Sequence, residues 1–270
     1  MTLAVLSDIH GNLPALDAVL ADAAAAGATR CVNLGDIVSG PLWPRETAER
    51  LMALGLPTIA GNHERQLLRG RAGRRMGASD AHAAADLGDV HWHWLATLPP
   101  TLRLEERVLL VHGTPTSDLD YLLEAVLPGF DPRDRAVAGH RGLVAADETT
   151  VDTRLGEVMR GVPDALVLCG HSHVPRAVAL ADGRLVVNPG SVGLQAYDDG
   201  RPHPHFVENG SPHARYALVT DTAAGWRVEL RAVPYDHWAA VRRAEANGRP
   251  DWADALRTGR VGRPEPAPMP

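Results

Sequence analysis

Five short apolar segments of this chain each stop abruptly at a turn that carries aspartate, asparagine or histidine. The clearest of them spans residues 31–34 and ends on Gly35 and Asp36. Val32 and Leu34 have the alternation of a buried strand, and Gly35 allows the tight turn that follows it. Open α/β sheets bind their ligands at this end of their strands. The five segments therefore favour a sheet whose strands deliver polar side chains to a single edge.

The order of the remaining patterns predicts an α/β fold. Strands and helices are expected to alternate in the first part of the chain, at residues 3–6, 13–26, 31–34, 46–54 and 58–60. This βαβαβ order is typical of a parallel sheet covered by helices. Two more strands and two antiparallel hairpins are expected further on, at residues 107–111, 165–169, 176–187 and 214–233.

Residues 1–258 are expected to form a single domain. Two insertions, at about 66–104 and 114–162, interrupt the alternation and are expected to supply a small helical cap; the second contains turns and two helices. The other predicted segments are an alanine-rich helix, a C-terminal helix and a disordered tail, at 79–98, 236–247 and 259–270.

Composition narrows the function classes. The net charge of −6 over 270 residues gives no general attraction to nucleic acid or to an anionic membrane. No apolar run approaches the ~18 residues of a membrane-spanning helix. The first strand is expected to begin at Thr2, so no signal peptide is expected. With only two cysteines, a cytoplasmic location is expected. All 27 basic residues are arginine, a compositional bias that weakens any argument from a single arginine, so the cluster at 69–75 is interpreted as solvated.

The polar side chains at the strand ends are the candidate functional residues. Aspartate and histidine spaced i, i+2 on an extended segment point to the same side, so each such pair can face a common centre. Carboxylate, amide and imidazole groups without thiolates suit manganese, iron, zinc, cobalt or nickel better than calcium or magnesium. A single strand-end histidine is usually structural, but the convergence of five segments favours a metal site. The candidates are Asp8, His10, Asp36, Asn62, His63, His112, His171 and His173.

These motifs, in this order, resemble the pattern of the calcineurin-like metallophosphoesterase superfamily. The stretch Asn188-Pro189-Gly190-Ser191 is similar to its small bacterial and archaeal phosphodiesterase-like branch. The motifs that carry the resemblance are Asp8-Ile9-His10, Gly35-Asp36, Gly61-Asn62-His63-Glu64, His112-Gly113 and Gly170-His171-Ser172-His173.

The resemblance implies a metallophosphoesterase-type β-sandwich flanked by helices, with α/β/β/α layers and a small helical cap. It also implies two divalent metal ions bridged by Asp36, with manganese expected and iron, zinc, cobalt or nickel as alternatives. A hydroxide between the ions would attack the phosphoester, and His63 would protonate the leaving group. The implied ligands are Asp8, His10, Asp36 and His173 for one ion, and Asp36, Asn62, His112 and His171 for the other.

The sequence departs from the protein phosphatase branch of that superfamily. There an aspartate orients the catalytic histidine and an arginine binds phosphate, whereas this chain has Ser39 and Gly40 at those positions. A phosphodiesterase is therefore expected, acting on a small phosphoester for which a nucleotide is one candidate, and hydrolysis of phosphomonoesters is left open. The alternatives are a non-catalytic scaffold, with or without metal, and a nucleoside polyphosphate or phosphoprotein phosphatase. The oligomeric state stays open.

Substrate contacts are predicted less sharply. Asn62 can contact substrate as well as metal. His140 and Arg141 lie in the second insertion, where a cap could reach substrate, although a position on a surface helix is slightly favoured. His203 and His205 lie in a loop, and loops frequently carry function.

Overall fold

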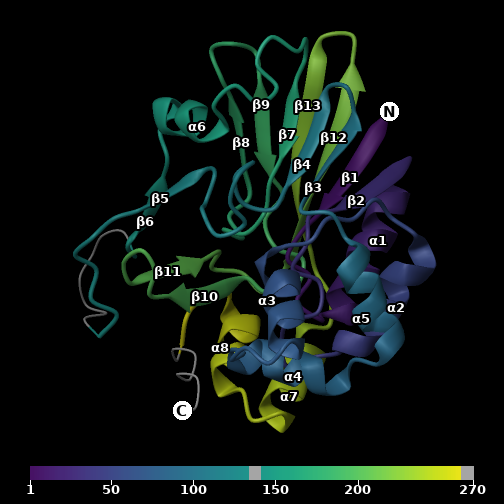
Figure 1. Cartoon of the computed structure of the whole chain (residues 1–270), viewed down its shortest axis with the longest axis vertical. Helices are drawn as coiled ribbons and strands as arrows, with labels where there is room; N and C mark the ends of the chain where they lie inside the picture. The colour runs from purple at the N-terminus through teal and green to yellow at the C-terminus, as the bar shows by residue number, and fades with distance from the viewer. Residues whose placement is uncertain (134–140, 263–270) are drawn as a thin grey trace.

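The computed structural model describes residues 1–133 and 141–262, and two β-sheets form its centre (Figure 1). The first sheet has the order β13-β12-β1-β2, in which β1 and β2 are parallel and the other neighbours antiparallel. Its strands are β1 (Thr2–Leu6), β2 (Arg30–Asn33), β12 (Ala214–Thr222) and β13 (Gly225–Val233).

The second sheet has the order β3-β4-β7-β9-β8, with β4, β7 and β9 parallel to one another. The outer strands β3 and β8 pair antiparallel to their neighbours. Its strands are β3 (Thr101–Glu105), β4 (Val108–Val111), β7 (Leu166–Leu168), β8 (Arg176–Ala179) and β9 (Leu185–Asn188).

Alternating side chains hold the two sheets together and attach the helices. Leu3 and Val5 of β1 pack against the second sheet, in a cluster that includes Leu110 of β4. Ala4 and Leu6 point the other way, into a core with the helices. That outer layer contains α1 (Leu13–Ala25), α2 (Pro44–Leu54) and α5 (Asp89–Thr97), while α6 (Glu148–Leu155) covers the far face of the second sheet. The predicted α/β/β/α layers are confirmed.

The first insertion differs from its predicted form. The single helix expected at 79–98 is two helices, α4 (Ala78–Asp86) and α5, separated by Leu87 and Gly88. Both residues are extended, and the Gly88 N–H donates to His91 Nδ1 at 2.9 Å, which starts the second helix. The insertion also contains most of α3 (Asn62–Arg71). It ends in β3, which joins the second sheet.

The second insertion is less helical than predicted. Its described residues contain one helix, α6, rather than two, together with the hairpin of β5 (Glu124–Val126) and β6 (Leu143–Ala145). β6 contacts a further hairpin that the sequence pattern did not indicate, formed by β10 (Ala196–Asp199) and β11 (His205–Glu208).

The C-terminal segment contains one helix more than predicted. After α7 (His237–Ala246) the chain forms α8 (Pro250–Thr258). The two helices lie near α4 at the lower end of the molecule in Figure 1, where α8 also contacts β10. Of the expected disordered tail, Val261 is buried and its N–H donates to Glu208, while 263–270 lie outside the described residues. Across the described ranges, no helix combines the length and apolar character that a membrane crossing requires.

Candidate active site

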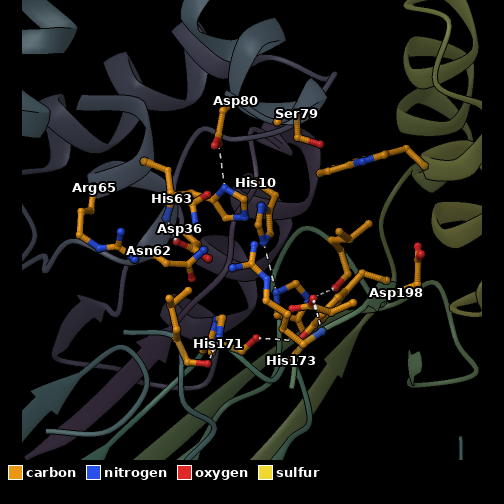
Figure 2. Close-up of a pocket in the computed structure, with 18 of the residues that line it drawn as sticks. His10, Asp36, Asn62, His63, Arg65, Ser79, Asp80, His171, His173 and Asp198 are labelled. Carbon is orange, nitrogen blue, oxygen red and sulfur yellow. Dashed lines mark hydrogen bonds and ion pairs between the residues drawn. The ribbon is translucent and has the colours of Figure 1, made fainter. Parts of the chain in front are cut away.

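The structure brings all eight strand-end candidates into one region, where the strands of both sheets end and α3 begins. Figure 2 shows the side chains of His10, Asp36, Asn62, His171 and His173 around a common space. Their contributors lie far apart in the sequence, so only the fold unites them. The first sheet supplies Asp8, His10, Asp36, Asn62 and His63, and the second supplies His112, His171 and His173.

The predicted ligands form two adjacent groups. In the first, Asp8, His10 and His173 place their donor atoms within 4.8 Å of one another, with the Nε2 atoms of His10 and His173 3.2 Å apart. In the second, the same limit holds for Asp36, His112 and His171.

Further contacts extend and join these two groups. Asn62 joins the second group, because its Oδ1 lies 3.1 Å from His112 Nε2. Asp36 Oδ2 is also 3.1 Å from that nitrogen. Asp8 Oδ1, 3.9 Å from His112 Nε2 and 3.3 Å from His173 Nε2, connects the groups.

The backbone at these positions is strained. Seven described residues other than glycine have a positive φ, and five of them are predicted ligands. The left-handed conformation costs an L-residue roughly 1–2 kcal/mol, so it persists only where the surrounding structure enforces it. The strain therefore agrees with the prediction that the strand ends form a functional site. The five ligands, with φ between 51° and 66°, are Asp8, His10, Asp36, His171 and His173.

Glycines allow the loops to approach closely enough for the ligands to meet. A Cβ on Gly61 would lie 2.2 Å from Asp36 Oδ1, and one on Gly35 would lie 2.3 Å from the Gly61 nitrogen. A Cβ on Gly170 would lie 2.0 Å from Ser7 Oγ. The glycines of the sequence motifs are thus required by contact between loops, and Gly35 also by its φ of 95°.

Each of the four ligand histidines has one ring nitrogen bonded to a backbone carbonyl. The Nδ1–H groups of His10, His112 and His173 donate to carbonyl oxygens at 2.7–2.9 Å, which leaves each Nε2 facing the centre. His171 is reversed, because its Nε2 donates to the Leu119 carbonyl at 3.0 Å and leaves Nδ1 for the centre. These backbone contacts fix the ring orientation that a metal ligand needs.

The donor set fits divalent metal ions. Asp8 Oδ1 is buried and, among the described residues, accepts no hydrogen bond. Two imidazole nitrogens 3.2 Å apart, each with its other nitrogen committed as a donor, also need a cation or a proton between them. Nitrogen and carboxylate donors without thiolate match the predicted metals.

Local electrostatics favours the ligating forms of most of these groups. Burial alone would raise the pKa of Asp8, but His173 and His112 outweigh it and lower the pKa to about 2. Burial, helped by neighbouring histidines, lowers the pKa of both His10 and His171 to about 4. These carboxylate and imidazole groups are therefore already deprotonated at neutral pH, as metal binding requires.

Glu64 connects two of the ligand loops, a role that its place in the sequence motif did not reveal. Its buried carboxylate accepts hydrogen bonds of 2.8 Å from the backbone N–H groups of Asp36, Ile37 and Gly61. In addition, the His63 N–H donates to Asp36 Oδ1 at 2.9 Å. The turn after β2 and the first turn of α3 are thus fixed to each other.

His63 has a carboxylate partner that sequence reasoning missed. Asp80 of α4 is buried, and its Oδ1 lies 2.7 Å from His63 Nδ1 (Figure 2). Although Ser39 replaces the orienting aspartate of the protein phosphatase pattern, Asp80 supplies such a group from a different element. Burial alone would lower the pKa of His63, but Asp36 and Asp80 outweigh it and raise the pKa to about 10.

The C-terminal helix α8 forms part of the site. Trp252 packs edge-on against the ring of His10 at 5.9 Å, and its ring fills the space in which a Cβ of Gly40 would lie. Arg249, in a buried ion pair with Asp251, donates from Nη1 to Ser79 Oγ at 3.0 Å. Since Ser79 precedes Asp80, α8 supports the helix that carries the partner of His63.

A cleft of about 1690 Å³ opens over the predicted ligands. One wall, from α3 and the turn after it, includes Arg65, Arg69 and Arg74, and another includes Asp198 and Trp252. The arginine cluster interpreted from the sequence as solvated is exposed, but it also lines this cleft.

Arg141 and the two predicted loop histidines do not line the cleft within the described parts of the chain. Arg141 lies 3.5 Å from Glu208, and His203 is exposed. His205 is fully buried and hydrogen-bonds the Tyr121 hydroxyl at 2.8 Å. The ring of Tyr121 packs against His171, so His205 lies behind a predicted ligand and outside the cleft. His140 falls outside the described residues.

The chain was compared with a family profile, with curated sequences and with solved structures. The sequence profile of the calcineurin-like phosphoesterase superfamily domain matches residues 1–207. An uncharacterized protein of Methanocaldococcus jannaschii is 26% identical over 262 residues, covering 93% of this chain and 94% of the relative. A metallophosphoesterase from Sphaerobacter thermophilus has a crystal structure with a TM-score of 0.69 and 23% identity, covering 96% of this chain and 99% of that one. Yfce, a phosphoesterase from E. coli, gives a TM-score of 0.42 and 21% identity, covering 87% of this chain and 100% of that one.

Proposed function

This chain belongs to the calcineurin-like phosphoesterase superfamily, and from that premise we propose that it hydrolyses phosphodiester bonds with two divalent metal ions. The observation that carries the proposal is the pair of adjacent ligand groups next to the His63–Asp80 contact. Seven predicted ligands exceed what a single tetrahedral structural ion uses. A scaffold without catalytic function would have no need for the buried aspartate behind His63.

Each group of residues has a distinct task in this proposal. Asp8, His10 and His173 would hold one ion. The other ion would be held by His112, His171 and Asn62, and Asp36 would be shared between the two. Two divalent ions bound there would supply the nucleophile and neutralise the phosphoryl oxygens of an in-line displacement. His63 directs its Nδ1 to Asp80, so its Nε2 is the atom that donates a proton to the leaving oxygen.

The proposed preference for diesters over phosphoproteins rests on the residues and the cleft around the predicted metal ligands. Gly40 offers no guanidinium for a terminal phosphate, and the ring of Trp252 occupies the space beside it. The cleft extends well beyond the ligands, along α3 on one side and toward β10 on the other. Such a cleft suits a substrate with groups on both sides of the scissile phosphate.

The proposal is tested by measuring hydrolysis and bound metal together. Purified protein is supplied with manganese, iron, zinc, cobalt or nickel, analysed for bound metal, and assayed with bis(p-nitrophenyl) phosphate, p-nitrophenyl phosphate and a phosphoserine peptide. We expect two ions per chain, the highest activity with manganese, and a preference for the diester. A chain that binds two ions and hydrolyses none of these esters would favour the scaffold alternative, and a preference for the peptide would contradict the substrate class.

The variant Asp36→Asn tests the bridging assignment. Because this carboxylate belongs to the second group and its pKa is held well below the usual range by His112 and His63 despite burial, its charge is available to both ions. We expect the variant to lose at least one ion and nearly all hydrolysis. Full metal content with near-normal turnover would show that another group bridges.

A further inference from the structure

The wall of the cleft formed by α3 and the following turn carries arginines at regular positions. Arg65 and Arg69 follow Asn62 at intervals of three and seven residues, so all three lie on one face of the helix. The backbone N–H of Arg74 donates to the Arg69 carbonyl at 3.0 Å, which brings the turn back beside the helix. All of these arginines line the cleft.

The arginines on this wall differ in their partners. Arg65 is committed to Asp118, with Nε–Oδ2 and Nη2–Oδ1 distances of 2.6 and 2.7 Å. By contrast, within residues 1–133 and 141–262 the guanidinium groups of Arg69 and Arg74 have no hydrogen-bond or ion-pair partner. Two exposed guanidinium groups on hydrogen-bonded backbone segments are available to bind one anion together.

The charge of the cleft is divided between its walls. The side formed by β10 and its neighbouring loops carries Asp120, Asp198 and Asp199, together with Arg201. Figure 2 shows Arg65 and Asp198 at opposite sides of the ligand cluster. An elongated anionic substrate is therefore directed toward the α3 wall and away from the carboxylates.

We propose that Arg69 and Arg74 form a subsite for a second phosphate of the substrate, separate from the phosphate that is hydrolysed. The inference rests on the proposed function and specifies its substrate class. Seven residues of helix separate Asn62 from Arg69, roughly 10 Å between backbone positions. That span suits two phosphates separated by a nucleoside better than the adjacent phosphates of a diphosphate. Because His63 lies on the same helix, the second phosphate belongs to the leaving group.

The test compares a thymidine dinucleotide lacking a terminal phosphate with the same dinucleotide phosphorylated at its 5′ or 3′ end. The measured quantity is the ratio of kcat/KM for each phosphorylated substrate to that for the unphosphorylated one. For the wild-type enzyme we expect a ratio well above one for at least one end. In the double variant Arg69→Gln/Arg74→Gln this ratio should fall roughly tenfold or more, mainly through KM, as expected for the loss of charged hydrogen bonds.

Arg71 provides the matched control. It lies on α3 between the two arginines but faces away from the cleft, where its Nη2 contacts Asp89 Oδ1 at 2.8 Å and its guanidinium lies over the Trp92 ring. Arg71→Gln removes the same charge from the same helix and should leave the ratio unchanged. An equal fall in this control, or an unchanged ratio in the double variant, would overturn the subsite. If the metal-loaded wild type hydrolysed neither dinucleotides nor bis(p-nitrophenyl) phosphate, the proposed function itself would fall, and the subsite with it.

Discussion

Two contacts of His63 distinguish a role as proton donor from a role as metal ligand. Its backbone N–H contacts Asp36 and its Nδ1 contacts Asp80, so its ring lies beside the ligands without completing either group. His63→Ala should therefore keep both ions while kcat falls by ~10²–10⁴-fold, the usual contribution of a proton donor. Metal analysis and steady-state kinetics on the same preparation check this. A lost ion would identify His63 as a ligand.

The loss of activity in His63→Ala should depend on the leaving group of the substrate. Nitrophenolate departs readily without a proton, whereas a ribose alkoxide does not. We therefore expect the loss on bis(p-nitrophenyl) phosphate to be clearly smaller than the loss on a dinucleotide. Equal losses would mean that His63 stabilises the phosphoryl group instead.

The buried Glu124 of β5 should make the free energy of unfolding depend on pH. Burial raises the pKa of its carboxyl to about 7, even though Arg176 and Arg154 lie nearby. The folded chain thus holds this proton more tightly than the unfolded chain, whose glutamate has a pKa near 4.5. The stability that Glu124 contributes is complete at pH values below 4.5 and is lost as the pH rises through about 7. The loss is on the order of 3 kcal/mol at most.

Glu124→Gln removes this titration while keeping the shape of the side chain. In urea unfolding with a chelator present, we expect the variant to gain stability relative to the wild type between pH 5 and pH 8. Glu157→Gln, at a side chain that is 87% exposed, is the control and should give no such gain. A pH-independent difference between Glu124→Gln and the wild type would contradict the assignment.

At the scale of elements, α8 supports α4 and thereby the Asp80–His63 contact. The link is the 3.0 Å hydrogen bond from Arg249 to Ser79. Ser79→Ala removes it while leaving the ion pair of Arg249 and Asp251 in place. We expect kcat to fall roughly fivefold, equivalent to one hydrogen bond of about 1 kcal/mol, with little change in KM.

A double-mutant cycle distinguishes this positioning role from a general loss of stability. If Ser79 acts through Asp80, the effect of Ser79→Ala should largely disappear in an Asp80→Asn background. Additive losses would show that Ser79 affects activity by some other route.

The elements that the sequence predicted are those with strong local signals. Continuous apolar runs predicted the strands that lead to Asp8, Asp36, His112 and His171. An Asp-Gly turn predicted the hairpin at 176–187. These segments also carried the ligand candidates. The family pattern and the predicted layers followed from them, because strand ends and their order determine where the ligands lie.

The elements that the sequence did not predict depend on contacts between distant residues. The alanine-rich stretch has helical propensity on both sides of Gly88, so the break at that glycine gives only a weak signal. α8 begins at Pro250, in a segment for which the sequence pattern predicted no helix. Asp80 lies 17 residues after His63 in the sequence, and nothing local indicates that α4 folds back on α3.

At the scale of the whole molecule, the two sheets meet at the predicted metal centre. The loops after β1 and β2 and the start of α3 belong to the first sheet, while those after β4 and β7 belong to the second. Bound ions would therefore connect the sheets and stabilise the strained ligand backbones. Since unfolded chain lacks the site, each ion should stabilise the fold by about 2.7 kcal/mol at a free concentration 100 times its Kd.

Urea unfolding with manganese and with a chelator measures this connection. We expect the midpoint to rise with manganese in the wild type and to rise much less in Asp36→Asn. Asp17→Asn is the control for a general effect of the salt, because Asp17 lies on the surface of α1 in an ion pair with Arg50, 2.9 Å away. It should respond as the wild type does.

Hydrogen exchange should slow on addition of manganese in the loops after β2 and after β7 together, because an ion shared by both sheets protects both. Protection confined to one sheet would mean that the ions do not join the sheets, and the bridging role of Asp36 would have to be abandoned.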